Sequence, residues 1–167
     1  MASTKLWKTF TNLIVEKLLT IRAGGRLEVT NKNGTSAARD LSYETLTATR
    51  TVLKEESGKT FILSSATEFV TTLPAPFLGA EYTFIVGAAP TGASYTVVTA
   101  ASANIIKGQA YPASGAAGDT GTTDDTVTFT DGAAVAGDML QVRSDGTSWF
   151  AHGYCAVATG IVYSTAS

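Results

Sequence analysis

A hairpin pattern near the C-terminus places the strongest constraint on the fold of this chain. Leu140 and Val142 alternate with polar residues, as in a strand with one buried face. The pair Asp145-Gly146 supplies a tight turn with positive φ, and a second extended run begins at Trp149. The pattern predicts two antiparallel strands joined by a turn, and the segment contains no catalytic motif.

Short extended runs separated by Gly and Pro continue through most of the chain. We expect strands near residues 51–54, 60–64, 69–73, 81–87, 94–99, 103–107, 126–130, 139–143, 148–153 and 156–163. Strands of this length with little helical periodicity predict an all-β fold, a β-sandwich or jelly-roll-like barrel. Residues 111–125 form the longest stretch without periodicity, and we expect a loop there that is either functional or mobile.

The N-terminal segment has a different periodicity. Apolar residues recur at helical spacing at Leu6, Trp7, Phe10, Leu13, Ile14, Leu18 and Ile21. Ser3 or Thr4 can cap a helix over residues 4–21, and Gly24-Gly25 ends it. Residues 26–30 alternate like a strand, residues 31–34 indicate a turn, and residues 35–52 resemble an extended linker or a strand segment that leads into the body. We therefore expect an N-terminal helix and anchoring arm over residues 1–52 and a β-sandwich or barrel domain over residues 53–167.

The apolar stripe of this helix must be buried against a surface. That surface is the chain's own body, a second copy of the chain, or a groove on a partner. Trp7 and Phe10 together favour an interface anchor, because aromatic side chains dominate interface energetics. We expect anchoring residues on the stripe and two steering lysines beside it: Leu6, Trp7, Phe10, Leu13, Ile14, Leu18, Lys5 and Lys8.

The charge of the chain is low and unevenly distributed. Charged residues make up 16% of the chain, against about 25% in typical proteins, and the net charge is −2. Residues 1–60 hold ten basic and six acidic residues, a net charge of +4, whereas residues 61–167 hold two basic and eight acidic ones, a net charge of −6. A basic arm on an acidic body could dock on an acidic partner or a neighbouring subunit, or could be a chance asymmetry. Bulk nucleic-acid binding is not implied.

Cysteine usage and hydropathy add two expectations. Cys155 is the only cysteine, so no intramolecular disulfide can form, and we expect a small buried core residue. No apolar run approaches the about 18 residues of a membrane span, and the N-terminus does not resemble a signal peptide. We therefore expect no membrane partner and synthesis in a cytoplasm.

Three local patterns resemble parts of catalytic or ligand-binding sites, and each also has a purely structural interpretation. Ser57–Thr60 matches the end of a phosphate-binding loop, but Leu53 occupies the position of the first glycine, and a turn before a strand is expected. His152 has no G-x-S-x-G motif to work with and is expected on a strand, facing solvent or an interface. A third pattern is an acidic group that could bind calcium or serve in turns: Asp119, Asp124, Asp125, Asp131 and Asp138.

The ordered series of strand motifs resembles a known class of domain. The motifs are SGKTF (57–61), TLPAP (72–76), YTFIV (82–86), YTVVT (95–99), IIKG (105–108), VTFTD (127–131), LQVRSDG (140–146) and SWF (148–150). Over about residues 53–163, the series resembles the β-domains of tailed-bacteriophage virion proteins, among them head decoration (cement) proteins, head fibres and tail-fibre modules. The resemblance implies a structural, non-enzymatic role without a cofactor.

The resemblance and the residues together favour a capsid decoration protein on the outer surface of the phage head. Its expected partners are the major capsid protein, bound through the N-terminal arm, and itself, as a homotrimer formed by the β-domain. The alternative is a tail-fibre or receptor-binding module that recognises host surface glycan, with Trp149, Tyr154 and Tyr163 as an aromatic platform. A polysaccharide depolymerase would need paired carboxylates in a cleft, and the adjacent acid pairs lie in segments that resemble turns.

Overall fold

The structure, a computed structural model, describes residues 20–21, 27–28 and 43–165. The chain divides into two units, Met1–Asp40 and Leu41–Ser167. This division precedes the boundary expected at residue 52, because β3 (Tyr43–Leu46) and β4 (Arg50–Thr51) already pair with strands of the second unit.

The described residues of the first unit form two short strands. β1 (Thr20–Ile21) pairs with β2 (Leu27–Glu28) in antiparallel orientation. β2 confirms the strand expected around residues 26–30. The helix expected over residues 4–21 is wrong at its C-terminal end, where β1 lies, and residues 4–19 lie outside the described part.

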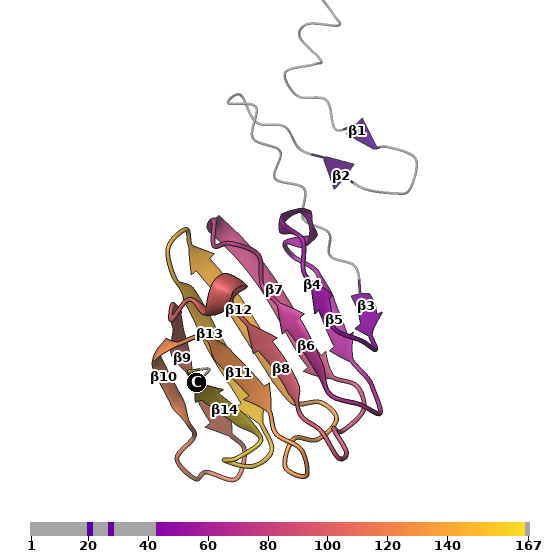
Figure 1. Cartoon of the computed structure of the whole chain (residues 1–167), viewed down its shortest axis with the longest axis vertical. Helices are drawn as coiled ribbons and strands as arrows, with labels where there is room; N and C mark the ends of the chain where they lie inside the picture. Colours follow the sequence, from indigo (N-terminus) through magenta and orange to yellow (C-terminus); the bar gives the residue numbers. More distant parts are fainter. Residues whose placement is uncertain (1–19, 22–26, 29–42, 166–167) are drawn as a thin grey trace, which may run out of the picture. The chain divides into compact units, whose positions relative to one another are not determined.

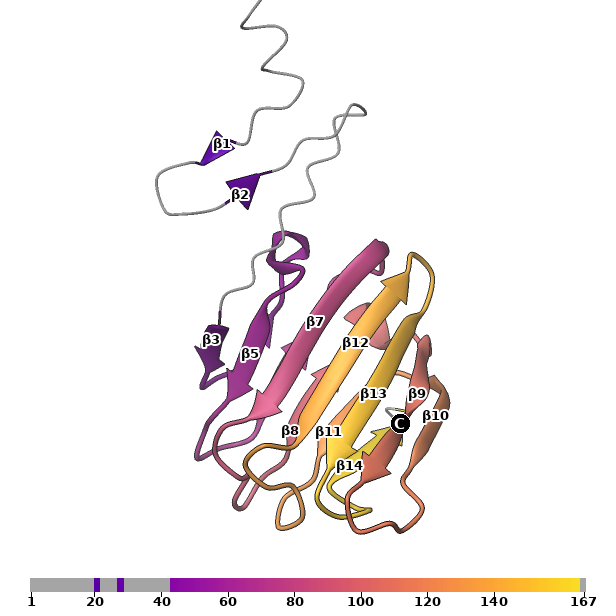
Figure 2. The ribbon, with the colours of Figure 1, turned by 180° about the vertical axis from the view of Figure 1, so that it is seen from behind.

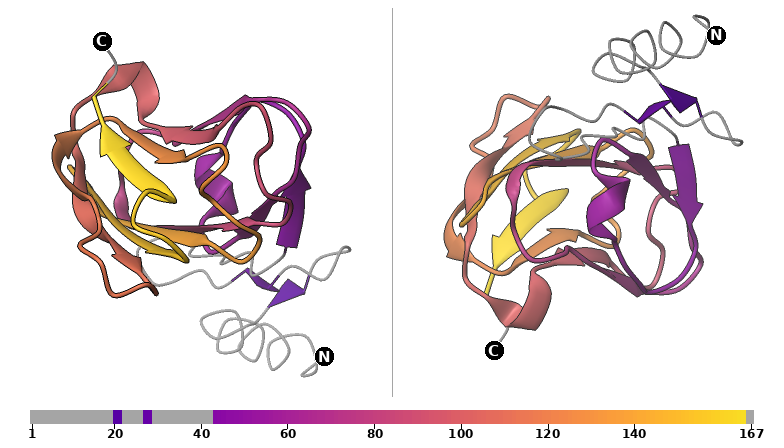
Figure 3. Two further views of the ribbon diagram at one scale, coloured as in Figure 1. Left: turned by 90° about the horizontal axis from the view of Figure 1, so that it is seen from below. Right: turned by 90° about the horizontal axis from the view of Figure 1, so that it is seen from above.

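The second unit is an all-β sandwich, as predicted. Its larger sheet has seven strands, in the spatial order β10 (Thr120–Asp124), β9 (Ile106–Pro112), β13 (Trp149–Cys155), β12 (Met139–Asp145), β7 (Leu78–Val86), β5 (Thr60–Leu63) and β3 (Figure 2). The smaller sheet has five, in the order β14 (Ile161–Ser164), β11 (Thr126–Phe129), β8 (Tyr95–Val98), β6 (Phe69–Thr72) and β4 (Figure 1). The views along the strands show the two sheets facing each other (Figure 3).

The first six strands of the sandwich wind between the two sheets. β3, β5 and β7 lie side by side and parallel in the larger sheet, and β4, β6 and β8 do the same in the smaller sheet. Parallel neighbours need a crossover connection, and here each crossover is a strand of the opposite sheet. All strand pairs formed by β9 to β14 are antiparallel, except that β9 lies parallel to β13.

The core between the sheets is rich in aromatic side chains. Phe61 stacks on Phe84 with ring centroids 5.5 Å apart, and Tyr82 lies against Trp149 at 5.9 Å. The largest fully buried side chains come from both sheets: Trp149, Tyr82, Tyr95, Phe61, Phe69, Phe84 and Phe129. These rings hold the layers together, since each buries a large apolar area and aromatic pairs add to that contribution.

The hairpin predicted near the C-terminus is present. β12 and β13 pair in register, and Gly146 adopts φ +98° in the turn between them. The carboxylate of Asp145 accepts the backbone N–H groups of Thr147 and Ser148, each at 2.8 Å. These hydrogen bonds, led by the one from Ser148, lower the pKa of Asp145 to about 2.

Other expected elements differ from the structure. Residues 111–125 include the end of β9 and all of β10, so the expectation of one long loop is wrong. β10 lacks apolar alternation because Gly121 lies against the ring of Tyr163, where a Cβ would come within 2.6 Å. The strand expected near residues 51–54 is present only at its start, as the end of β4, and the 3-10 helix η1 (Lys54–Glu56) replaces its last residue. Residues 100–102 form a second 3-10 helix, η2 (Ala100–Ser102).

Cys155 is buried at the end of β13, as expected, and has no disulfide partner. Burial raises the pKa of its thiol, and the nearby Asp138 carboxylate acts in the same direction. Because the thiolate is the reactive form, we expect a disulfide-exchange reagent such as DTNB to modify the folded protein far more slowly than the protein in denaturant. Comparable rates in the two states would contradict the burial.

Candidate functional site

The predicted anchoring residues cannot be placed in the structure. They are Lys5, Leu6, Trp7, Lys8, Phe10, Leu13, Ile14 and Leu18, and all of them lie outside the described residues. The candidate sites of the second unit are a charged cluster at one end of the sandwich, an acidic group in the loops, and the outer faces of the two sheets.

The segment Ser57–Thr60 is a turn before a strand, as expected. Gly58 has φ +96°, β5 begins at Thr60, and the Lys59 amine is held by Glu44 and Glu56 at 2.7 and 2.9 Å. A phosphate-binding loop instead leads into a helix and points its lysine at the ligand. The lysine in this segment therefore serves an ion-pair cluster.

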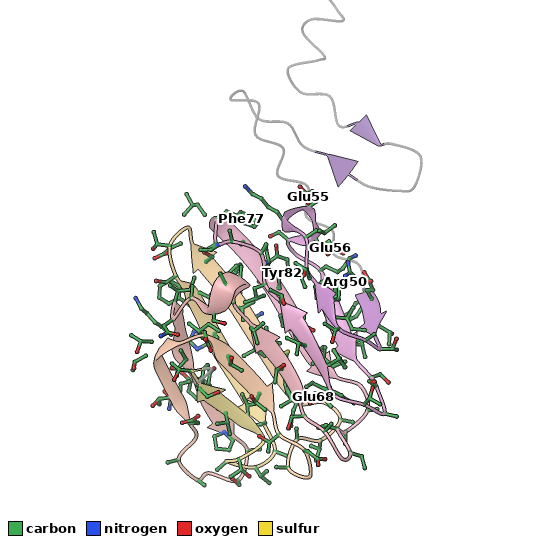
Figure 4. The ribbon with its side chains drawn as sticks, viewed as in Figure 1. Arg50, Glu55, Glu56, Glu68, Phe77 and Tyr82 are labelled. Carbon is green, nitrogen blue, oxygen red and sulfur yellow. The ribbon has the colours of Figure 1, made fainter. Side chains whose placement is uncertain are left out.

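Four side chains form this ion-pair cluster, which we define as Glu44, Arg50, Glu56 and Lys59. Arg50 also contacts Glu44 and Glu56, and the second oxygen of Glu56 accepts the Leu53 N–H at 2.8 Å. The guanidinium of Arg50 and the amine of Lys59 lie 5.6 and 5.8 Å from the centre of the Phe61 ring. Figure 4 shows Arg50 and Glu56 at one end of the sandwich and Glu68 at the other.

The cluster covers the aromatic stack at the first turn of the winding. Glu44 of β3 is the register partner of Phe61, which in turn pairs with Phe84. Across the three neighbouring strands, the edge strand β3 therefore carries the charged Glu44 at this register position, and β5 and β7 carry Phe61 and Phe84. The cluster joins β3, β4, η1 and the turn before β5, so its ion pairs hold the outermost strands of both sheets.

The electrostatics of the cluster predict a dependence of stability on pH. Burial opposes the charged form of Glu56, but the Leu53 N–H, Lys59 and Arg50 outweigh it and lower its pKa below the ordinary 4.5. Burial likewise opposes charged Lys59, but Glu44 and Glu56 raise its pKa above 10.5. The lowered pKa of Glu56 stabilises the fold above pH 4.5 and this contribution disappears on acidification. The raised pKa of Lys59 stabilises it below pH 10.5 and this contribution disappears in strong base.

Replacing Glu56 with glutamine tests this dependence. We expect Glu56→Gln to lower the free energy of unfolding at pH 7 by about 1–3 kcal/mol, since hydrogen bonds to a charged group are lost. Between pH 5 and pH 3, we expect the free energy of unfolding of Glu56→Gln to fall by less than that of the wild type. Urea unfolding at several pH values measures both effects. The exposed neighbour Glu55 provides the control variant Glu55→Gln, for which the wild-type pH profile is expected.

The acidic group serves the backbone of the loops. Asp138 accepts the N–H groups of Val135 and Ala156 at 3.0 and 2.9 Å, so it joins its own turn to a second loop. Asp119 accepts the Tyr163 N–H at 2.7 Å, and Asp131 accepts that of Gly92 at 2.9 Å. No group of three potential metal ligands occurs in the described part of the chain.

The aromatic platform expected from Trp149, Tyr154 and Tyr163 does not exist in that form. Trp149 is fully buried and Tyr163 is 6% exposed, because both point into the sandwich. Tyr154 is exposed on the outer face of the larger sheet, where Tyr111 of β9 stacks on it with ring centroids 5.6 Å apart. His152 faces outward on the same strand, as expected, and lies 6.2 Å from the Tyr111 ring.

The exposed side chains of β9 and β13 form three pairs in register. Lys107 pairs with Phe150, Gln109 with His152, and Tyr111 with Tyr154. We call these six residues the outer aromatic patch. Sequence reasoning missed Tyr111 and Phe150, because Tyr111 was assigned to a loop and Phe150 follows a tryptophan that could equally have faced outward.

The outer face of the smaller sheet has a uniform composition. Its outward residues are Thr51, Val70, Thr72, Thr96, Val98, Thr126, Thr128, Val162 and Ser164. We call this set the threonine–valine face. None of the nine is charged, none is larger than valine, and all but Thr51 are partly buried.

Among the residues that the structure describes, no helix is long and apolar enough to cross a membrane. The chain matches no protein-family model, and none of the curated proteins shows significant sequence similarity to it.

Proposed function

We propose that this chain is a bacteriophage structural protein that decorates the outer surface of the capsid. Its N-terminal segment binds the major capsid protein, and its β-sandwich associates with copies of itself as a homotrimer. The mechanism is mechanical, because a protein bound across neighbouring capsid subunits adds buried area between them and resists internal pressure. The observation that carries the proposal is the threonine–valine face.

The threonine–valine face has the properties of a permanent protein contact. Short β-branched side chains lose little rotamer freedom on burial, and the absence of charges avoids a large desolvation penalty. Five neighbouring strands present these side chains as one surface. In a cyclic trimer this surface contacts a different surface of the next copy, and closed symmetry limits growth to three subunits.

The low charge of the whole chain and the basic N-terminal segment support the same assignment. The segment carries the apolar stripe with Trp7 and Phe10, beside Lys5 and Lys8. Aromatic residues suit a desolvated anchor, and lysines increase the rate of association with an acidic surface.

The oligomeric state tests the role of the threonine–valine face. We expect light scattering after size-exclusion chromatography to give a trimer of 17.3 kDa chains. The double variant Thr72→Lys with Thr128→Lys is expected to be a folded monomer, because buried unpaired lysines disfavour the contact. A control with the same charge change on the other sheet, Thr45→Lys with Thr122→Lys, is expected to remain trimeric. A monomeric wild type would contradict this part of the proposal.

Binding to the particle tests the function itself. We expect the full chain to co-sediment with heads that lack it, and immunogold to label the whole head surface. Trp7→Ala with Phe10→Ala is expected to abolish co-sedimentation, whereas Val15→Ala, which lies off the apolar stripe, is expected to bind normally. Gold confined to the tail tip, or undiminished binding after deletion of residues 1–25, would overturn the proposal.

A further inference from the structure

Beyond the buried Ile106 and Trp149 at their first positions, β9 and β13 display large side chains outward and keep small ones inside. Phe150 and Tyr154 are 40% and 48% exposed, while Ala151 and Gly153 between and beside them are buried. β5 and β7 do the reverse, as strands of a sandwich usually do. A group of large apolar side chains exposed on one face of a sheet commonly marks a binding surface for a ligand or another macromolecule.

Packing explains the small inward residues Ala151 and Gly153, but it does not explain the exposed aromatic residues of the same strand. Tyr163 of β14 passes over this part of the sheet and its hydroxyl donates a hydrogen bond to the Ala151 carbonyl at 2.9 Å. A Cβ on Gly153 would come within 3.0 Å of the Ile161 side chain. Packing therefore demands small residues on the inside, but it places no demand on the exposed positions of the same strands.

The outer aromatic patch combines rings, planar polar groups and positive charge in a fixed order. Gln109 and His152 form the middle pair, with Tyr111 and Tyr154 on one side and Phe150 on the other. Phe150 stands between Lys107 of β9 and Arg143 of β12, its two register partners. Arg143 is 62% exposed and also contacts Glu81 at 3.1 Å.

Two cations border the exposed ring of Phe150: Lys107, a member of the patch, and Arg143 on the neighbouring strand β12. Lys107 and Arg143 are the only basic residues after residue 60, a region with eight acidic ones. Both flank the same exposed ring. A site that places two cations beside an exposed aromatic ring suits a ligand with an apolar face and a negative group.

We propose that the outer aromatic patch binds an acidic saccharide, a sugar chain that carries carboxylate groups. The polarised C–H bonds of a pyranose ring are attracted to the negative face of an aromatic ring. The amide of Gln109 and the imidazole of His152 offer donors and acceptors for hydroxyl groups. Lys107 and Arg143 supply charge-assisted hydrogen bonds to a carboxylate.

The size of the patch favours a saccharide over a macromolecule. Three outward residues on a strand span about 13 Å, and two strands lie about 4.8 Å apart. A standard protein interface covers about 800 Å² on each partner, which is several times this footprint.

The inference is independent of the capsid assignment, and the isolated full chain is sufficient to test it. Titration of the ¹⁵N-labelled protein with a hexameric uronate oligosaccharide from alginate is expected to shift the amide signals of residues 107–111 and 150–154. The signals of residues 43–46, on the opposite edge of the same sheet, are expected to stay in place. The uncharged maltohexaose is expected to bind at least tenfold more weakly, and added salt is expected to reduce this difference.

Variants with a matched control identify the contacts. Phe150→Ala and Tyr154→Ala are each expected to weaken uronate binding at least tenfold. Tyr43→Ala removes an exposed tyrosine from β3 of the same sheet and is expected to bind like the wild type. Lys107→Gln is expected to weaken binding of the charged hexamer but not of maltohexaose.

Several results would overturn the inference. They are the absence of saturable binding to the uronate, equal affinity for the two hexamers, and wild-type affinity in the Phe150→Ala and Tyr154→Ala variants. Sedimentation velocity supplies another, because dissociation of an oligomer by Phe150→Ala would assign the patch to a protein contact. Failure of capsid binding would leave the saccharide measurements unaffected.

Discussion

Replacing Trp149 with alanine is expected to lower the free energy of unfolding by about 3–5 kcal/mol. The side chain is fully buried at the start of β13 and lies against Tyr82 of β7 with ring centroids 5.9 Å apart. Its indole N–H has no acceptor among the described residues, so the loss is one of packing alone. Removal of this largest buried side chain leaves a cavity, and the closely packed residues around it can fill it only in part, so most of the lost contacts are not replaced.

Urea unfolding followed by circular dichroism measures the effect. The adjacent Phe150→Ala is the matched control, since it removes an aromatic side chain from the same strand on the opposite face. Surface substitutions usually change stability by no more than about 0.5 kcal/mol, and we expect that range for Phe150→Ala. Equal losses in the two variants would show that the assignment of inner and outer faces on β13 is wrong.

Addition of a single methyl group at Gly108 is expected to be comparably damaging. Gly108 of β9 is the register partner of Ala151 of β13, and a Cβ at this position would lie 1.6 Å from the Ala151 carbonyl oxygen. The obstructing atom belongs to the backbone, so no side chain can turn away. We expect Gly108→Ala to cost more than the about 1–3 kcal/mol typical of overpacking.

The neighbouring residue provides the control for Gly108→Ala. Gln109 is exposed on the outer face of β9, and Gln109→Ala is expected to unfold at nearly the wild-type urea concentration. Amide hydrogen exchange adds a local measurement, because loss of the close approach should reduce protection in β9 and in its neighbour β10 first. Wild-type stability of Gly108→Ala would contradict the parallel β9–β13 pairing.

The local signals in the sequence account for many of the strands. Alternation of apolar and polar residues located β5, β6, β8 and β12, and the pair Asp145-Gly146 located the turn of the β12–β13 hairpin. These features depend on neighbours in the chain, so a pattern of a few residues contains the information. β10 was missed because its residues depend on a contact distant in the sequence. The ring of Tyr163, far along the chain, leaves room only for glycine at position 121.

The candidate sites show the same division. The exposed position of His152 and the turn before Thr60 follow from local patterns, and the structure confirms both. The ion-pair cluster was not foreseen, although all four of its members lie between residues 44 and 59. Its geometry depends on β3 and β4 lying at corresponding edges of two sheets, which no spacing in the sequence indicates.

The sequence by itself determined that this chain forms short strands, where many of them lie, and that its β-rich part is acidic. The tertiary structure alone decided which strands are neighbours, because parallel pairs such as β9 and β13 are not joined by a turn whose residues could reveal the pairing. It also decided which face of β13 is buried. Large side chains occur at both phases of its alternation, and only the space left by Tyr163 and Ile161 selects Trp149 for the core and leaves Phe150, His152 and Tyr154 outside.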